Sequence, residues 1–179
     1  MNSIQVLDAE LCKLQQAFSR VAADAEFNYV CSLSNEALIK QQAYKGIYLI
    51  EIRTTGPHKD LASWFTAFQA DWEHPKFKSS FTPNTKKKRI AAHRTLSEWM
   101  PLYIGKAKIV SSRVWEHVDL ELQAKTFALK LRQRPTLKLR DFRLSTINLT
   151  ALDVQNYDLV APAVEQAMRN KLNPLVGRQ

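Results

Sequence analysis

Six polar side chains, scattered along the sequence, are of types that bind anions, hold cations and move protons. They are Tyr48, Tyr103, Lys106, Arg113, His117 and Glu165. Guanidinium and ammonium groups bind anionic oxygens, a carboxylate can hold a hard divalent cation, and an imidazole titrates near neutral pH. Taken singly, each also has a structural explanation, because tyrosine is common in strands and charged residues cover exposed helix faces. Their joint chemistry depends on the elements that position them.

The two tyrosines fall in segments that the sequence predicts to be strands. Residues 46–53 are rich in β-branched and aromatic side chains, and a turn with glycine and proline follows them. Residues 102–105 predict a second short strand that ends at a glycine. Tyr48 and Tyr103 are therefore expected on strands of one sheet.

The other charged candidates fall in predicted helices. Residues 111–120 predict a helix on which Arg113 and His117, four positions apart, share one face. Residues 159–172 predict a closing helix, in which Glu165 is surrounded by apolar residues. A guanidinium, an imidazole and a carboxylate would thus be held by helices beside the sheet.

The remaining pattern completes a small α/β domain with a central sheet. Residues 126–131 and 142–149 alternate in polarity as strands do, whereas residues 61–72 and 90–100 predict helices. Residues 76–89 are basic and without period, which predicts an exposed loop. We find no internal repeat, and 179 residues suit a single domain.

The N-terminal part predicts a helical arm. Apolar residues recur there at spacings of three and four, at Leu7, Leu11, Leu14, Phe18 and Val21, and a second short helix follows near Asn35. We expect this stripe to pack on the protein's own sheet; a seam between two copies is the alternative. The expected division is an arm over 1–45 and a domain over 46–179, with inserted material at 54–100.

Charge and composition narrow the classes of function. The chain carries 26 Lys and Arg against 17 Asp and Glu, for a net charge of +9, and its isoelectric point is about 9.7. This excess favours a polyanionic partner such as nucleic acid, although charge for solubility alone is an alternative. No apolar run is long enough to span a membrane. Two cysteines without neighbouring metal ligands favour a reduced, cytoplasmic protein.

The candidate residues together resemble the GIY-YIG nuclease family. The two tripeptides stand as Gly46-Ile47-Tyr48 and Tyr103-Ile104-Gly105. The lysine after the second tripeptide, the arginine and histidine of the next helix, and a late glutamate before an Asn-Pro-Leu stretch follow in the family's order. The resemblance covers residues 45–179, and it implies a small central, mostly antiparallel sheet flanked by helices.

Two features depart from the family pattern. Family members usually join the two tripeptides by a short turn, whereas residues 49–102 separate them here. Such insertions are similar to those of restriction endonucleases in this family. The family typically has an asparagine two residues after the leucine of Pro174-Leu175, where this chain has Gly177. Asn173 is the nearby residue that could replace it.

The resemblance implies a metal-dependent endonuclease that hydrolyses phosphodiester bonds in DNA. Glu165 would bind Mg²⁺, with Mn²⁺ as a substitute, and Arg113 would hold the scissile phosphate. We favour Tyr48 as the general base; Tyr103 would orient water or phosphate. His117 would position Tyr48 or relay a proton, and Lys106 would supply positive charge that lowers a tyrosine pKa.

Basic residues outside this set predict contacts with double-stranded DNA. They form two groups, Lys86, Lys87, Lys88 and Arg89 in the inserted loop and Arg132, Arg134, Lys138 and Arg140 further on. Either group could instead be a merely solvated loop. Trp64, Phe68 and Trp72 could stack on bases, but their helical spacing favours a place in the core.

Because the chain is too short for a separate DNA-binding domain, we expect a self-contained restriction-type or phage-type enzyme. Cutting both strands of a duplex could require a homodimer, since one site cuts one strand at a time. One alternative is a catalytically weak or inactive nucleic-acid-binding protein on the same fold. Another is an antibacterial nuclease toxin with an immunity protein. An enzyme acting on RNA is the last.

Overall fold

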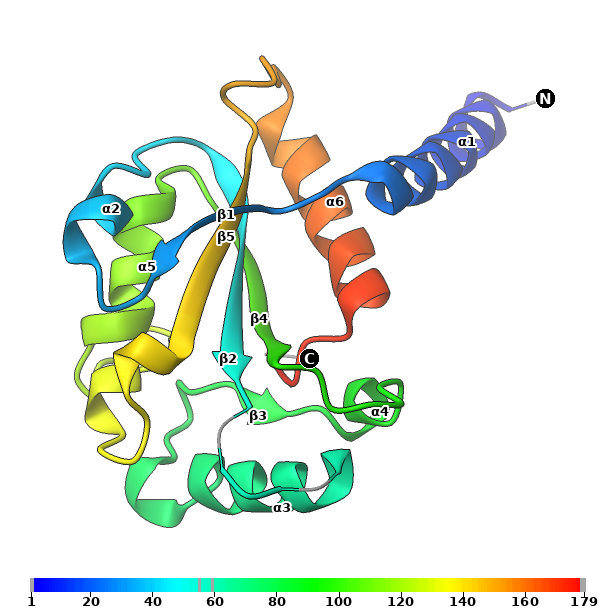
Figure 1. Ribbon diagram of the computed structural model, residues 1–179. Coiled ribbons are helices and arrows are strands. Elements are labelled where there is room, and N and C mark those ends of the chain that lie inside the picture. Colours follow the sequence, from blue (N-terminus) through cyan, green and yellow to red (C-terminus); the bar gives the residue numbers. More distant parts are fainter. Residues whose placement is uncertain (1, 55, 59, 178–179) are drawn as a thin grey trace.

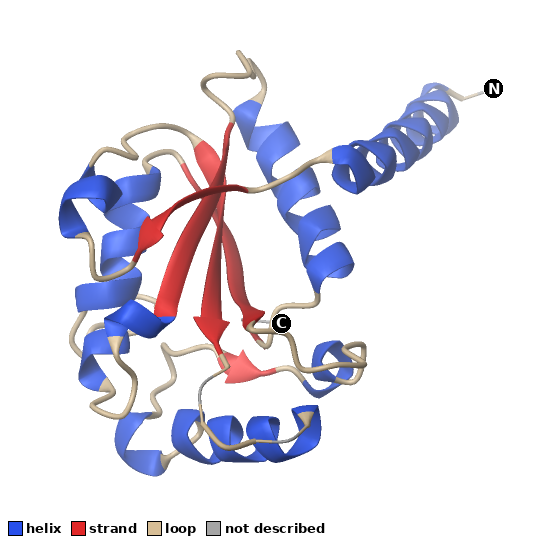
Figure 2. Ribbon diagram, in the orientation of Figure 1, coloured by secondary structure: helices blue, strands red, loops and turns tan. Residues whose placement is uncertain are grey.

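A four-stranded antiparallel sheet forms the centre of the molecule in the computed structural model, which describes residues 2–54, 56–58 and 60–177 (Figure 1). The strand order is β1-β5-β2-β4. The strands are β1 (Asn28–Ser32), β2 (Gly46–Arg53), β4 (Trp99–Ala107) and β5 (Phe142–Asn148). Helices lie on both faces of the sheet (Figure 2). The predicted fold class, an α/β domain with a small antiparallel sheet flanked by helices, is confirmed.

The two faces of the sheet have separate apolar cores. Along β2, Ile47 and Leu49 pack with α6 (Tyr157–Leu172), whereas Tyr48 and Ile50 belong to the larger core with α5 (Val110–Asp119). This is the alternation expected of a strand covered on both sides, and it leaves almost no exposed residue on β2. The short helix α2 (Glu36–Lys40) adds to the α5 side.

The two tripeptides lie opposite each other on β2 and β4. Tyr48 pairs with Gly105, and Ile50 pairs with Tyr103. A Cβ at Gly105 would lie only 2.2 Å from Tyr48 Oη, and one at Gly46 would lie 2.6 Å from the Ile147 carbonyl oxygen. Both positions therefore exclude larger residues, and Gly105 makes the space for the Tyr48 hydroxyl.

Two predicted elements are wrong. Residues 126–131 do not join the sheet; they form a loop along α5, where the Ala128 amide donates to the Phe81 carbonyl at 3.0 Å. Burial along this loop does not alternate, because Thr126 is exposed and Ala128–Leu131 are all buried. Residues 90–100 are not a helix either, because only Lys87–Ile90 are helical (α4), and Trp99 already pairs with Arg53.

Strand β1 was not predicted from the sequence, and its residues were assigned to the arm. Residues 28–32 pair with β5 at the sheet edge, so this part of the predicted 1–45 arm contributes to the sheet. The strand has only five residues, and a register shift between Tyr29 and Cys31 breaks its alternation. A short bulged edge strand leaves little periodic signal.

The inserted segment folds into small elements below the sheet in the view of Figure 1. It contains α3 (Leu61–Trp72), a 3₁₀ turn over Pro75–Phe77, β3 (Asn84–Thr85) and α4; β3 pairs with β6 (Val176–Gly177) near the C-terminal end. Trp64, Phe68 and Trp72 of α3 are buried and stack at ring-centroid distances of 5.3 and 5.5 Å. The prediction that these rings belong to the core is confirmed.

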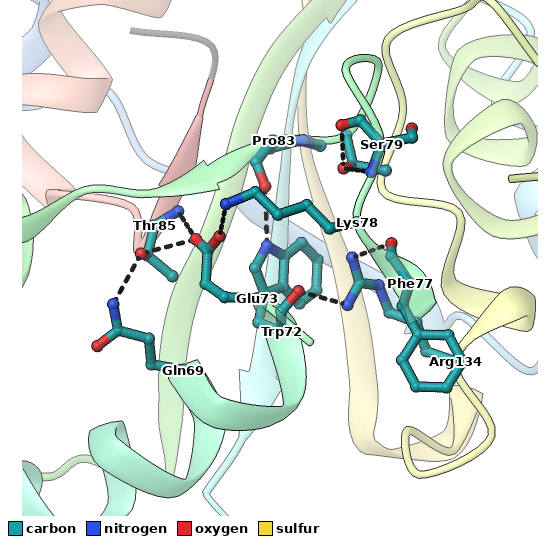
Figure 3. A network of polar contacts seen from close by, with 10 residues as sticks. Gln69, Trp72, Glu73, Phe77, Lys78, Ser79, Pro83, Thr85 and Arg134 are labelled. Atoms are coloured by element: carbon teal, nitrogen blue, oxygen red, sulfur yellow. Dashed lines mark hydrogen bonds and ion pairs between the residues drawn. The ribbon is translucent and has the colours of Figure 1, made fainter. Parts of the chain in front are cut away.

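Polar contacts fix the end of α3 to the rest of the insertion (Figure 3). The Glu73 carboxylate accepts hydrogen bonds from Lys78 Nζ at 2.6 Å and from the Thr85 amide at 2.8 Å. The Trp72 indole donates to the Pro83 carbonyl at 2.8 Å. The segment is therefore ordered by its own side chains.

Arg134 joins the insertion to the 131–140 loop. Its guanidinium donates to the carbonyls of Trp72 at 2.9 Å and Phe77 at 3.3 Å, and it lies 4.0 Å from the centre of the Trp72 ring (Figure 3). Because Arg134 is buried, it cannot contact DNA, and its place in the predicted DNA-binding group is wrong.

The N-terminal helix α1 (Ser3–Asp24) projects from the body of the protein, with only its C-terminal end beside α6 (Figure 1). Leu7, Leu11 and Leu14 are exposed by 60, 52 and 47%. The expectation that the stripe packs on the sheet is therefore wrong for these three; Phe18 does contact the α6 core, and the Val21 side chain lies outside the described ones. Among the described residues, no helix meets the length and apolarity that crossing a bilayer requires.

Candidate active site

Tyr48, Tyr103 and His117 form a ring cluster at the heart of the site. Tyr48 and Tyr103 stack with centroids 6.2 Å apart, and the His117 ring lies 5.6 Å from the first and 4.8 Å from the second. Tyr48 comes from β2, Tyr103 from β4 and His117 from α5, on which Val110, Val114 and Val118 anchor the helix in the core. Three distant segments thus bring their aromatic side chains together.

The hydrogen bonds of His117 fix its tautomer. Its Nδ1 accepts a hydrogen bond from the Leu129 amide at 3.0 Å, and its Nε2 lies 2.8 Å from Tyr48 Oη. A backbone amide can only donate, so Nδ1 carries no proton and, in the neutral ring, Nε2 donates to Tyr48. Burial, and secondarily the Arg113 charge, lowers the pKa of His117 well below its ordinary value. The imidazole is therefore neutral around pH 7.

Both phenols are protonated in this arrangement. Burial raises the pKa of Tyr48 well above its ordinary value, with a contribution from Tyr103, and Arg113 only partly opposes this. Burial also raises the pKa of Tyr103, against the charges of Arg169 and Arg113. Since His117 already donates to Tyr48 Oη, the Tyr48 hydroxyl proton is available to an acceptor other than His117.

Glu165 is a buried carboxylate held by two cations. Lys106 Nζ lies 2.7 Å from Oε2, and the Arg169 guanidinium lies 2.7 Å from Oε1. Arg169 sits one turn after Glu165 on α6 and also donates to the Ile104 carbonyl of β4 at 3.1 Å. The Glu165 side chain is only 7% exposed, whereas that of Lys106 is 36% exposed. Lys106 is thus the partner with freedom to turn toward a ligand.

Arg113 approaches from the other face of the sheet. Its guanidinium pairs with Glu116 on α5 and donates to the Phe127 carbonyl. Although burial acts in the opposite direction, the neighbouring Tyr48 and Glu116 raise the pKa of Arg113. The group is therefore a permanent cation beside the tyrosines.

One pocket of about 320 Å³ lies beside the edge strand β4 and is lined by both tyrosines and by the charged residues of the site. Because β4 has no further neighbour in the four-stranded sheet, side chains of α5 and α6 can meet around its edge. The lining contains Tyr48, Tyr103, Gly105, Lys106, Arg113, Phe127, Glu165 and Arg169. Three cationic side chains face a single carboxylate, so the pocket is suited to bind an anion.

The donor set also fits a hard divalent cation. Mg²⁺ is often bound by one or two carboxylates and keeps several of its waters, which suits a single Glu165 at the wall of a polar pocket. Oε2 could become available if the half-exposed Lys106 ammonium turned to a bound anion. Among the described residues, no three His, Cys, Asp or Glu side chains cluster to form an all-protein metal site.

Five of the six residues singled out from the sequence line the pocket, and His117 lies behind Tyr48. Arg169 was not predicted as a site residue, although its spacing of four from Glu165 on a predicted helix was a usable signal. Neither of the residues considered for the family's asparagine lines the pocket. Gly177 pairs with Asn84 in the small sheet, and Asn173 ends α6 in a left-handed conformation.

The two predicted DNA-binding groups lie on different sides of the sheet. Lys86, Lys87, Lys88 and Arg89 are at α4, to the right in Figure 1, next to α6. Arg132, Lys138 and Arg140 are exposed on the yellow loop to the left, where Arg132 pairs with Asp119. The first group therefore borders the candidate active site.

In comparisons with known proteins, no protein-family model, no curated protein and no solved structure matches the chain. The assignment of a function thus depends on the site itself.

Proposed function

We propose that the protein is a metal-dependent endonuclease that hydrolyses phosphodiester bonds in DNA, as a self-contained restriction-type or phage-type enzyme. One observation carries the proposal: two tyrosines, three cations and one buried carboxylate converge on a single pocket. The resemblance of the same residues to the GIY-YIG motifs supports it independently of the geometry. Hydrolysis of a phosphodiester needs an activated water and positive charge at the phosphate, and these groups can supply both.

The cations bind the scissile phosphate. Arg113 and Arg169 reach the pocket from α5 and α6, and both guanidinium groups are anchored on backbone carbonyls. Anchored donors need little reorganisation to stabilise the charge that develops on phosphate oxygens. Lys106 leaves Glu165 for the phosphate and adds a third positive charge.

Tyr48 handles the proton of the attacking water. The Leu129 amide orients His117, and His117 Nε2 donates to Tyr48 Oη, which fixes the phenol and stabilises its anionic form. Tyr48 acts as the base after its own proton has passed to solvent in the pocket; the phenolate then takes the proton of the attacking water. Tyr103, stacked on Tyr48, orients the water or a phosphate oxygen.

Glu165 holds the divalent cation, Mg²⁺ or Mn²⁺. When bound, the ion supplies positive charge that neutralises phosphate oxygens and lowers the pKa of nearby hydroxyl groups. That charge is what the Tyr48 phenol requires, because burial outweighs the effect of Arg113 on its pKa.

The experiment is cleavage of plasmid DNA by the wild type, Glu165→Gln and Glu116→Gln, with magnesium and with a chelator. Glutamine keeps the shape of Glu165 and removes its charge, so we expect loss of cleavage by about 1,000-fold or more at unchanged fold, while DNA binding persists. Glu116→Gln is the matched control, because Glu116 pairs with Arg113 but does not line the pocket. Normal cleavage by Glu165→Gln, or full activity in chelator, would refute the metal role.

A second candidate is a nucleic-acid-binding protein without strong catalysis. It is favoured by the two cations that occupy both oxygens of Glu165, and by Gly177, which stands where the family has an asparagine. The same assay separates the two, because a pure binder retains DNA in a binding measurement but cuts under neither condition.

A further inference from the structure

A second pocket lies next to the candidate active site, between α4 and α6. Its volume is about 380 Å³. The residues that matter here are Lys86, Lys87, Lys88, Arg89, Gln166 and Arg169. The pocket therefore joins the basic run of the insertion to the helix that carries Glu165.

Arg169 belongs to both pockets. Its side chain lines the active-site pocket, where it pairs with Glu165, and it also lines the second pocket. Its backbone carbonyl accepts a hydrogen bond of 2.5 Å from Arg89 of α4. Gln166 follows Glu165 directly on α6 and reaches the second pocket as well. Arg169 thus forms the border between the two, which makes them neighbours along a single surface.

Positive charge in the second pocket is not neutralised by the protein. No Asp or Glu lines it within the described part of the chain, and no ion pair found among the described residues involves Lys86, Lys87 or Lys88. Burial, together with the Arg169 charge, lowers the pKa of Arg89, as expected where like charges lie close together. Such a cluster is stabilised when an anion binds.

The other basic group differs in this respect. Arg132 pairs with Asp119 and lies over the Trp115 ring at 4.9 Å. Its positive charge is therefore partly neutralised by the protein itself. The exposed Lys138 and Arg140 lie on the yellow loop, on the far side of the sheet from α4 in Figure 1. The α4 cluster is therefore the one that continues the active-site surface.

We propose that the pocket between α4 and α6 binds a backbone phosphate of duplex DNA next to the scissile one. The strand passes from the active-site pocket across Arg169 to Lys87 and Lys88. The contacts are to phosphate, so they are independent of base sequence. This inference rests on the proposed nuclease function and names the path of its substrate.

The test measures binding of a short DNA duplex in chelator, at several salt concentrations, by the wild type and by a Lys87→Gln/Lys88→Gln variant. Removing two phosphate contacts should make the slope of log affinity against log salt less steep by about 1.8 and lower the affinity roughly tenfold or more at low salt. The matched control is Lys13→Gln/Lys40→Gln, which removes the same charge from two exposed lysines that line neither pocket and belong to neither basic group, and it should change the affinity less than about threefold. Lys87→Arg/Lys88→Arg should bind as the wild type does.

Four results would decide the matter. Unchanged affinity and slope in the Lys87/Lys88 variant would overturn the proposed path, and so would an equal loss in the control, which would indicate a general effect of charge. Because the binding is measured without metal, it does not depend on cleavage. A wild type that binds through Lys87 and Lys88 but never cuts would support this inference and refute the nuclease proposal. Cleavage that is unchanged when both lysines are replaced would refute this inference and support the nuclease proposal.

Discussion

His117 shows how a single residue connects the interior of the domain to the candidate site. Its imidazole is fully buried, with Leu129 on one nitrogen and Tyr48 on the other. Both bonds need the tautomer with hydrogen on Nε2. Protonation of Nδ1 would set an N–H against the Leu129 amide and would place a charge next to Arg113. The neutral ring is thus a condition for the Tyr48 geometry.

This residue predicts a specific loss of stability in mild acid. An unfolded histidine binds a proton near pH 6.5, whereas the pKa of His117 in the folded protein is well below that value. The unfolded state therefore takes up the proton first. The stabilisation due to the neutral ring is complete above about pH 6.5 and is lost as the pH falls below it, by up to about 1.4 kcal/mol per pH unit.

Urea unfolding between pH 7 and pH 5 measures this effect. The free energy of unfolding of His117→Gln should be lower at pH 7 but should fall less steeply with pH than that of the wild type, because the glutamine does not titrate. His93→Gln is a suitable control, since His93 is only partly buried and its side chain bonds the Asn173 carbonyl, away from the tyrosines. Parallel curves for the wild type and His117→Gln would contradict the assignment.

At the scale of elements, the sequence predicted those that carry the site better than those around it. Residues 46–53 are buried almost without a break, as their continuous apolar composition indicates, and the helices near 111–120 and 159–172 bury residues three and four positions apart, as predicted. Residues 126–131 were mistaken for a strand because their residue types resemble those of a strand, whereas in the fold Ala128–Leu131 are buried without a break. The predicted helix at 90–100 is absent because Trp99 already pairs with Arg53 in the sheet. That pairing is a long-range contact, which the local sequence pattern cannot reveal.

The site was predictable only where residue type itself carried the signal. Tyr48, Lys106 and Glu165 were found because their order matched a motif. Arg169 was missed because an arginine on a helix is usually a solvated residue, and only the fold brings it to the Ile104 carbonyl. Arg134 was misjudged for the same reason: a basic loop residue is rarely a core residue.

The junction between the insertion and the 131–140 loop depends on Arg134. Burial lowers the pKa of its guanidinium to about 10, with Asp71 and Glu73 acting in the opposite direction. The group is kept charged by the carbonyls of Trp72 and Phe77 and by the Trp72 ring. Without it, those two carbonyls would face the interior with no donor from the loop.

Replacing Arg134 should therefore affect folding and not DNA binding. Arg134→Met keeps much of the apolar stem but removes both hydrogen bonds, and we expect a loss of about 2–4 kcal/mol in the free energy of unfolding. The exposed Arg140→Met, on the same loop, should change it by less than about 0.5 kcal/mol. Chemical denaturation and duplex binding, measured on both variants, test this. Weaker DNA binding by Arg134→Met at unchanged stability would return Arg134 to the DNA-binding surface.

At the scale of the whole molecule, α1 packs on the domain only at its C-terminal end, beside α6. It extends away from the sheet, and Ile4, Leu7, Leu11 and Leu14 leave an apolar stripe exposed at spacings of three, four and three residues (Figure 1). This is the repeat of a coiled-coil seam, with a period of 3.5 residues. A monomer has one candidate site, and a nuclease with one site cuts one strand of a duplex at a time. A dimer through α1 would supply the second site.

We expect two copies of the chain to associate through this stripe. Burying each half-exposed leucine contributes roughly 1 kcal/mol, so Leu7→Gln/Leu11→Gln, which changes four side chains per dimer, should weaken the dimer by about 1,000-fold. Sedimentation at increasing protein concentration should show a wild-type dimer and a monomeric variant. On supercoiled plasmid, the variant should accumulate nicked circles where the wild type gives linear DNA. Val6→Gln is the matched control, because Val6 is exposed on α1 but lies off the stripe. A wild type that stays monomeric and still linearises plasmid would exclude α1 as the seam.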